Sequence, residues 1–306
     1  MRNKKRPSVD IILCSYNQEE YISQALGSLV TQRVDADVRV IVADDCSTDQ
    51  TPQIIHEYQA KSPFPFIYLK ANSNRGMKAN YRRAFAACQG DYVAILEGDD
   101  WWHASTHLSQ HIDFLESHPR HSMSYNLVAY YWQDTGATHP QQWLYKDLQY
   151  LSINLRQQIA WGNQIGNLSS CMFRTRLLHA LPDAFYQLNF ADWELGIMMA
   201  RKGPIAMLRE VTSTYRINSK GQWTSLSNEK KYDSQIQSLE DIQPLLPAYC
   251  KCYIRSFQKN IRSGKEMPYV IPFKYKLKSF IRKNLRHSDS KLQTLNYRTL
   301  NSDSKL

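Results

Sequence analysis

Short apolar runs alternate with longer segments of helical periodicity over the first hundred residues. Runs of five or six residues predict strands at 9–14, 38–43, 66–70 and 92–96. Apolar residues recurring three or four positions apart predict helices at 19–30, 50–60 and 77–88. Strands that alternate with single helices are typical of a doubly wound, mainly parallel α/β sheet.

The remainder of the chain is less regular. The pattern predicts strands at 122–132, 169–173, 205–208 and 211–215, and helices at 192–202 and 225–243, with a helical or mixed segment at 144–160. Segment 272–287 has apolar residues on one helical face and basic residues elsewhere, which predicts an amphipathic helix. Such a helix either lies on an anionic membrane surface or packs on the core of the protein. Residues 288–306 are polar, and we expect them to be disordered.

The positive charge of the chain is confined to its C-terminal part. Of the 38 Lys and Arg and 28 Asp and Glu, residues 251–306 hold 14 and 3, which leaves 24 and 25 for residues 1–250. A body without excess positive charge argues against a nucleic-acid partner. The first apolar run is too short for a signal peptide, and no stretch approaches the roughly 18 apolar residues of a membrane span. We therefore expect a cytoplasmic protein, either free or peripheral on the inner face of the membrane.

Acidic and amide side chains follow three of the predicted strands. They are Ser15, Tyr16, Asn17 and Glu19 after the first strand, Asp44 and Asp45 after the second, and Glu97, Asp99 and Asp100 after the fourth. Ligands of open α/β sheets bind at these strand ends. Two aspartate pairs in one place repel each other unless a cation lies between them, and Mg²⁺ or Mn²⁺ shares its ligands with substrate phosphates. The pattern therefore predicts a site for a metal and a diphosphate.

Several other kinds of site are excluded. Neither a GxGxxG loop nor a GxxxxGK[ST] loop is present, which excludes the common dinucleotide and P-loop sites. No HExxH motif occurs, so we do not expect a catalytic zinc ion of that type.

Five segments, taken together in their order and spacing, resemble the family 2 glycosyltransferases of the GT-A fold. They are CSYNQEEYISQALGSLVTQ at 14–32, VADDCSTDQT at 42–51, NRGMKANYRRAFAACQGDYVAILEGDDWW at 74–102, DWELGIMMARKG at 192–203 and YRINSKGQW at 215–223. The resemblance implies a Rossmann-like GT-A domain over 1–224, with its mainly parallel sheet flanked by helices. A helical C-terminal extension over 225–287 would follow.

The resemblance also implies roles for the acidic strand ends. Ser15, Tyr16, Asn17 and Glu19 match the loop beside the nucleotide, and Asp45, supported by Asp44, matches the acid that binds the base. The pair Asp99 and Asp100 matches the element that contacts the ribose and ligates the metal, and either residue could be the metal ligand. Glu97 stands where many relatives carry Asp, and it remains a candidate supporting residue.

Further roles are implied for the later motifs. Asp192 matches the general base of inverting members, although capping of the following helix would also explain an acid there, and Glu194 is the alternative base. The candidates for diphosphate and acceptor contacts are Arg216, Asn218 and Trp223. Many relatives carry His where this chain has Asn218, which bears on metal preference and activity. Trp101 and Trp102 could stack on a sugar ring, and we expect at least one of them to pack beneath the loop instead.

The implied function is inverting transfer of a sugar from a nucleoside-diphosphate sugar, with UDP-sugars the first expectation, to a glycan or lipid-linked acceptor. The implied setting is the synthesis of a cell-surface polysaccharide such as a capsule, O-antigen or exopolysaccharide. One alternative is a non-catalytic homologue that binds nucleotide or glycan, which Asn218 leaves open. A second alternative, a sugar-nucleotide pyrophosphorylase, would require a glycine-rich basic loop after the first strand, where this chain has Ser15, Tyr16 and Asn17.

Overall fold

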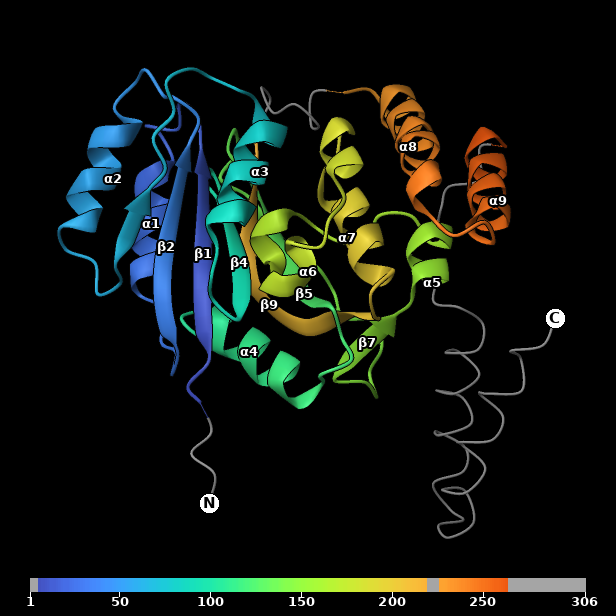
Figure 1. Cartoon of the computed structure of the whole chain (residues 1–306), viewed down its shortest axis with the longest axis horizontal. Helices are drawn as coiled ribbons and strands as arrows, with labels where there is room; N and C mark the ends of the chain where they lie inside the picture. Colours follow the sequence, from blue (N-terminus) through green and yellow to red (C-terminus); the bar gives the residue numbers. More distant parts are fainter. Residues whose placement is uncertain (1–4, 219–225, 264–306) are drawn as a thin grey trace, which may run out of the picture. The chain divides into compact units, whose positions relative to one another are not determined.

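A computed structural model describes residues 5–218 and 226–263, which are built around one mixed β-sheet (Figure 1). Its strand order is β3-β2-β1-β4-β8-β5-β9-β7, and β6 pairs with β5. The strands are β1 Ser8–Ser15, β2 Asp37–Asp44, β3 Phe66–Tyr68, β4 Tyr92–Glu97, β5 Met123–Trp132, β6 Thr138–Pro140, β7 Tyr150–Ile153, β8 Cys171–Arg174 and β9 Ile205–Ile217. Strands β3, β2, β1 and β4 are parallel, as predicted, and β8 runs antiparallel between β4 and β5.

Helices connect these strands and cover the sheet. They are α1 Ile22–Val30, α2 Thr51–Gln59, α3 Met77–Ala87, α4 His107–Ser117, α5 Leu155–Ala160, α6 Thr175–Leu178, α7 Asp192–Ala200, α8 Asn228–Ile242 and α9 Cys250–Arg262. All of these elements belong to one compact unit, which comprises Met1–Trp143 and Leu148–Met267. The described part of a second unit is Leu144–Asp147. The helices expected at 19–30, 50–60, 77–88, 192–202 and 225–243 are confirmed as α1, α2, α3, α7 and α8.

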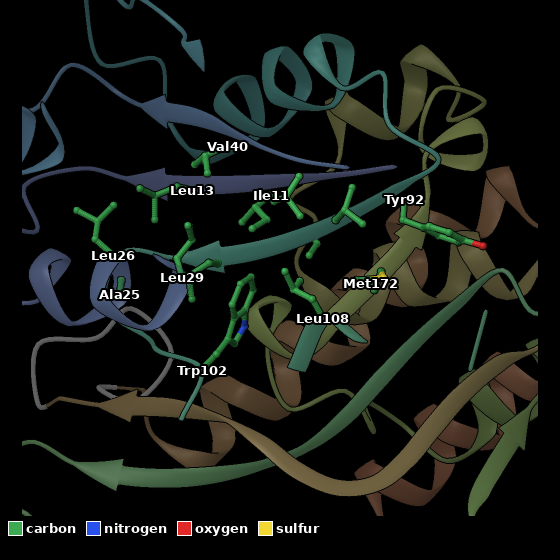
Figure 2. Close-up of a cluster of buried hydrophobic side chains, with 14 of the residues drawn as sticks. Ile11, Leu13, Ala25, Leu26, Leu29, Val40, Tyr92, Trp102, Leu108 and Met172 are labelled. Carbon is green, nitrogen blue, oxygen red and sulfur yellow. The ribbon is translucent and has the colours of Figure 1, made fainter. Parts of the chain in front are cut away.

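One face of the parallel strands carries a cluster of buried hydrophobic side chains (Figure 2). There Ile11 and Leu13 of β1 meet Leu26 and Leu29 of α1, and none of these side chains reaches solvent. Side chains alternate along a strand, so Ile12, which is equally buried, belongs to the opposite face. A strand buried on both faces reads as a continuous apolar run, which is why these strands are visible in the sequence. Each such side chain contributes about 1.5–3 kcal/mol of burial energy, which fixes the strand ends that carry the polar loops.

The two strands predicted at 205–208 and 211–215 are one strand, β9. Its pairing with β5 shifts register after Leu208, so that Arg209 and Glu210 form a bulge and have no partners on β5. The two side chains are exposed and form an ion pair at 2.9 Å. A bulge leaves polar residues facing solvent inside a continuous strand, and the sequence pattern alone does not distinguish it from a turn.

Two further segments differ in detail from the prediction. The helical or mixed segment at 144–160 contains β7 followed by α5, and Asn154 caps α5 by accepting a hydrogen bond from Gln157 N at 3.1 Å. The strand predicted at 169–173 begins as a single 3₁₀ turn, Leu168–Ser170, before β8. The expected amphipathic helix at 272–287, the tail at 288–306 and Trp223 lie outside the described residues. In the described ranges, no helix combines the length and apolar character required to cross a bilayer.

Candidate active site

The parallel register brings the acid-bearing strand ends together. Ser15 of β1 lies beside Asp44 of β2, and Cys14 of β1 lies beside Glu97 of β4. Backbone hydrogen bonds continue the ladder past the strand ends, from Asp45 N to Ser15 O at 2.9 Å and from Gly98 N to Cys14 O at 2.8 Å. The three loops that follow these strands therefore begin side by side at the carboxyl ends of the parallel strands.

Gly98 is required for the close approach of the β4 loop to β1. A Cβ atom at this position would lie 3.1 Å from the Cys14 carbonyl oxygen and 3.1 Å from Ile22 Cδ1. We expect Gly98→Ala to lower the free energy of unfolding by about 1–3 kcal/mol, because the backbone carbonyl cannot move aside cheaply. Urea unfolding measures this loss. Gly136→Ala is the comparison, because no heavy atom lies within 4 Å of the Cβ added there, so its cost comes from backbone conformation and not from steric contact. A Gly98→Ala protein as stable as the wild type would contradict the close approach.

The loops after β1 and β2 are joined through their side chains. Asn17, which adopts the left-handed conformation at φ 51°, accepts a hydrogen bond from Thr48 N at 2.9 Å. Glu19 accepts one from Gln50 N at 2.9 Å. Tyr16, which directly precedes Asn17, has 43% of its surface exposed. Asn17 and Glu19 thus hold the two loops together, whereas Tyr16 is available for a ligand.

Asp44 and Asp45 are both buried and hold neighbouring backbone in place. Asp44 accepts hydrogen bonds from Ser15 Oγ at 2.8 Å and from Ser47 N at 3.0 Å. Asp45 accepts from the backbone N–H groups of Arg75 and Gly76, at 2.7–3.1 Å. Gly76 has φ 81°, a conformation that glycine adopts readily. Asp45 therefore positions the segment that leads into α3.

Asp100 is the most enclosed of the acids after β4, with 1% of its surface exposed. Its Oδ1 accepts a hydrogen bond from Arg216 N at 2.9 Å. Its Oδ2 accepts from Asn167 Nδ2 at 2.5 Å and from Ser169 Oγ at 2.7 Å. Burial raises the pKa of Asp100 well above its usual range, and the charges of Asp99 and Glu97 add to the effect. These contacts tie the β4 loop to β9 and to the segment before β8.

Glu97 and Asp99, by contrast, are partly accessible. Glu97 Oε1 accepts a hydrogen bond from the Tyr81 hydroxyl at 3.1 Å. Burial, followed by the charges of Asp99 and Asp192, raises the pKa of Glu97 to about 8. Burial also raises the pKa of Asp99, against the opposing effects of a hydrogen bond from its own backbone and of the Arg216 charge. Both carboxyl groups are thus partly accessible and have raised pKa values, and a cation bound between them would favour their ionised forms.

The donor set fits a divalent cation whose shell is completed by a ligand. Within the described part of the chain, no three His, Cys, Asp or Glu side chains are grouped so that they could hold a metal by themselves. Mg²⁺ and related ions are commonly bound by one or two carboxylates together with substrate phosphates. Glu97 and Asp99 supply such carboxylates, whereas both oxygens of Asp100 already accept hydrogen bonds from protein donors.

Asp192 and Glu194, at the start of α7, have different roles in the structure. Asp192 is partly accessible, and its Oδ2 accepts a hydrogen bond from Asn163 Nδ2 at 2.9 Å. Burial raises the pKa of Asp192 to about 7, while the Asn163 hydrogen bond lowers it. Glu194 is buried, and its Oε2 accepts from Ala191 N at 2.9 Å, which satisfies a free N–H at the helix start. Glu194 is thus the capping residue, and Asp192 is the more accessible of the two acids.

Arg216 is buried among its own partners. Its Nε donates to the Asp99 carbonyl oxygen at 2.7 Å, and its other nitrogens donate to the side-chain oxygens of Gln24 and Gln133. The guanidinium also lies 4.7 Å from the ring centroid of Tyr21 and 4.9 Å from that of Trp101, in cation–π geometry. Arg216 therefore fastens the β4 loop to β9.

The remaining candidates lie in different surroundings. Trp102 is 2% exposed and donates from Nε1 to Ser169 O at 2.7 Å, so it packs beneath the loop, as expected for at least one of the two tryptophans. Its ring is not accessible to a sugar. Trp101 is partly exposed and packs edge-on against Tyr131. Asn218 follows directly after β9, at the end of the first described range.

Sequence reasoning missed the residues that hold the acids. Asn163, Asn167 and Ser169 come from the polar stretch GNQIGNLSS at 162–170, and this unusual run of amides and hydroxyls before a strand was the available signal. A second missed group is His103, His107 and His111, whose spacing of four is evident in the sequence. His107 and His111 are buried and hydrogen-bond Thr212 and Ser124, each at 2.8 Å. The histidines fasten α4 to the sheet behind the site.

Comparison with known proteins gives a consistent assignment. The sequence profile described as Glycosyl transferase family 2 matches residues 10–180. An uncharacterized protein of Mycobacterium tuberculosis is 33% identical over 227 residues, which cover 73% of this chain and 62% of that protein. This chain therefore spans about three fifths of the length of that relative.

Two solved structures have a similar fold. Residues 1–349 of TarS from Staphylococcus aureus, in complex with UDP-GlcNAc, align with a TM-score of 0.60 at 24% identity, covering 82% of this chain and 71% of that one. The mannosyltransferase PcManGT from Pyrobaculum calidifontis, in complex with GDP-Man and Mn²⁺, aligns with a TM-score of 0.59 at 16% identity, covering 93% and 82%. The mixed α/β fold expected from the sequence is therefore confirmed as that of GT-A-like glycosyltransferases. Since the family profile matches more than half of its length, the chain belongs to glycosyltransferase family 2.

Proposed function

We propose that the protein is an inverting glycosyltransferase that moves a sugar from a nucleoside-diphosphate sugar to a hydroxyl group of an acceptor. The observation that carries this proposal is the grouping of Glu97, Asp99 and Asp192. All three are partly accessible, and the charges of Asp99 and Asp192 both raise the pKa of Glu97. Acids from the end of β4 and the start of α7 thus share one electrostatic environment at the edge of the sheet.

In this proposal Asp192 is the general base. The acceptor oxygen forms a bond to the anomeric carbon while the bond from that carbon to the diphosphate oxygen breaks, with its electron pair leaving on the diphosphate. Asp192 takes the proton of the acceptor hydroxyl. A base is most effective when its pKa lies near the working pH, and the pKa of Asp192, about 7, meets that condition.

Asp99, with Glu97 beside it, is the proposed metal position, and Asp100 holds this loop from behind. A divalent cation, Mg²⁺ or Mn²⁺, supplies positive charge that stabilises the departing diphosphate when it is bound there. The nucleotide would lie along the loops that carry Ser15, Tyr16, Asn17, Glu19, Asp44 and Asp45. Trp101, Asn218 and Trp223 remain candidates for diphosphate or acceptor contacts, whereas the contacts of Arg216 support a structural role.

The choice of donor and acceptor rests on the relatives. The TarS structure contains UDP-GlcNAc and the PcManGT structure contains GDP-Man, so the fold accommodates more than one base. We propose a UDP-sugar for this protein, since TarS also aligns in sequence, at 34% identity over 109 residues. That relative is named a poly(ribitol-phosphate) β-N-acetylglucosaminyltransferase. We propose a glycan or lipid-linked acceptor in cell-surface polysaccharide synthesis, and a cytoplasmic protein that is peripheral on the membrane.

A thermal-shift panel tests the donor site. UDP-, GDP-, dTDP- and CMP-sugars are each combined with Mn²⁺, Mg²⁺ or EDTA. We expect a metal-dependent increase in melting temperature with UDP-sugars, because a ligand at about a hundredfold over its dissociation constant adds about 2.7 kcal/mol of stability. Release of nucleoside diphosphate from the stabilising donor then measures turnover. A protein that binds donor but never releases the diphosphate, even with acceptors present, would be the non-catalytic homologue.

A further inference from the structure

Helix α9 has two different sides, and its apolar side is already used. Ile254, Phe257 and Ile261 are buried, and the helix packs on α5. The Phe257 ring lies 5.2 Å from that of Trp193 in α7. The packing of α9 against the rest of the unit is therefore complete on this side, and its other side is left for solvent or for a partner.

The outward side of α9 is a row of basic residues. Lys251, Arg255 and Lys259 are four positions apart and Arg262 is three further on, so they follow one side of the helix. All four are exposed, and α9 contains no acidic residue. With a rise of 1.5 Å per residue, the row extends over about 16 Å.

Three more basic residues lie at the adjoining corner of α5 and α7. Arg156 of α5 is exposed and lies over the rings of Tyr249 and Tyr253, at 5.3 and 5.7 Å from their centroids. Arg201 and Lys202 directly follow α7 and are also exposed. Together with the α9 row they form what we call the basic face, which consists of Lys251, Arg255, Lys259, Arg262, Arg156, Arg201 and Lys202.

The basic face contains two shallow hollows. One, of about 410 Å³, is lined by Arg156, Arg201, Lys202 and Tyr249, among others. The other, of about 430 Å³, is lined by Arg255, Lys259 and Arg262, together with Gln258 and Ser263. Each hollow thus offers several cationic groups to a small anionic group such as a phosphate.

In the described ranges, no salt bridge neutralises this charge. None of the seven basic side chains forms an ion pair with a carboxylate of residues 5–218 or 226–263. Glu240 of neighbouring α8 accepts a hydrogen bond from the neutral Gln258, at 3.1 Å. Charges of one sign held together repel one another, and an anionic partner would relieve that repulsion.

We propose that the basic face binds the anionic surface of a lipid membrane. A row of exposed Lys and Arg, with Tyr249 49% exposed at its end, is suited to a broad surface that presents many phosphates. The sequence beyond α9 has the same character, since residues 264–306 contain 10 Lys and Arg and 3 acidic residues. The basic face consists of described residues, and its binding to a membrane does not depend on the transfer chemistry.

Vesicle binding by the full chain tests the proposal. We expect binding to vesicles that contain phosphatidylglycerol, no binding to pure phosphatidylcholine, and a decrease with salt as the charges are screened. Each basic residue close to an anionic leaflet contributes a factor of about five to the partition coefficient. The variant Lys251→Gln, Arg255→Gln, Lys259→Gln, Arg262→Gln should therefore bind at least about 100-fold more weakly.

A control variant with the same change in net charge tests whether binding depends on the basic face or only on total charge. It replaces four exposed basic residues elsewhere by Gln, namely Arg33, Lys61, Arg120 and Arg209, and it should bind vesicles as the wild type does. Equal binding by both variants would assign the affinity to another part of the chain and overturn the proposal. Wild-type binding to soluble polyphosphate without binding to vesicles would overturn it in favour of a phosphate polymer. The donor-induced thermal shift of both variants verifies the fold and keeps this test separate from that of the transferase site.

Discussion

Asp192→Asn should lower kcat by about 10²–10⁴-fold, the usual contribution of a general base, while donor affinity remains nearly unchanged. The amide keeps the shape of the side chain and can still accept the hydrogen bond from Asn163, but it cannot take a proton. Single-turnover kinetics, with donor titration by thermal shift, separates the two quantities. Wild-type turnover by this variant would remove Asp192 from the mechanism.

Glu194→Gln is the matched control. Gln keeps an oxygen that can accept from Ala191 N, so helix α7 should remain capped and turnover should change little. A large loss of turnover with Glu194→Gln alone would transfer the role of base to Glu194.

The pH dependence provides a second test of the same assignment. Because the base must be ionised, kcat/KM should rise with pH and level off above the pKa of Asp192, about 7. The Asn163 hydrogen bond lowers that pKa, so Asn163→Ala should shift the rise to higher pH. A loss of activity without such a shift would mean that Asn163 acts only on stability.

The ionisation of Asp192 should make the stability of the folded protein decrease as pH rises. Its pKa in the folded protein is raised above the usual value of 3.8, so the folded state holds this proton more strongly than the unfolded state. This contribution to stability is fully present below the unfolded pKa and is lost as pH rises through about 7. Asp192→Asn lacks this loss, so its stability relative to the wild type should improve as pH rises.

Asp99→Asn should remove the metal dependence of donor binding, with a decrease in affinity of at least about 100-fold. Asp99 is one of the two partly accessible acids at the end of β4, and its replacement removes a carboxylate from the proposed metal position. Calorimetric titration of the donor in the presence of Mn²⁺ measures this effect. Unchanged, metal-dependent affinity would contradict the assignment of the metal position.

Asp100→Asn is the comparison that distinguishes a structural role of an acid in this loop from a role in metal binding. Asp100 accepts hydrogen bonds from three protein donors, and an amide nitrogen cannot accept in place of an oxygen. A buried donor left without a partner costs about 1–3 kcal/mol, so this variant should lose stability. Asp99→Asn should retain stability, because it removes a carboxylate whose ionisation is disfavoured in the folded state.

Metal affinity should also rise with pH. The raised pKa values of Glu97, about 8, and of Asp99 mean that the free site holds protons that a cation must displace. We therefore expect affinity for Mn²⁺ with donor to increase up to about the pKa of Glu97. Proton release on binding, measured in buffers of different ionisation enthalpy, reports this directly.

The strands and helices of the first hundred residues could be predicted because their signals are local. Strands β1, β2 and β4 are continuous apolar runs, since both faces of each strand are buried. The bulge at Arg209 and Glu210 could not be predicted in this way, because two exposed polar residues look the same in a turn and inside a strand. The acidic residues that follow the strands, and the motifs that resemble family 2, are also short sequence patterns, so they too could be recognised without the structure.

The presence of carboxylates after several strands, and of an acid at the start of a later helix, follows from the amino-acid sequence alone. Which of these carboxylates are accessible depends on how distant segments pack around them. Asp100 is enclosed by Asn167, 67 positions away, while the carbonyl of Asp99 is held by Arg216, 117 positions away. Burial and hydrogen bonding separate these adjacent residues, and both depend on contacts between distant segments that no local pattern records. A carboxylate's identity is a property of the sequence, but its pKa and its freedom to bind a cation or take a proton come from what the fold packs around it.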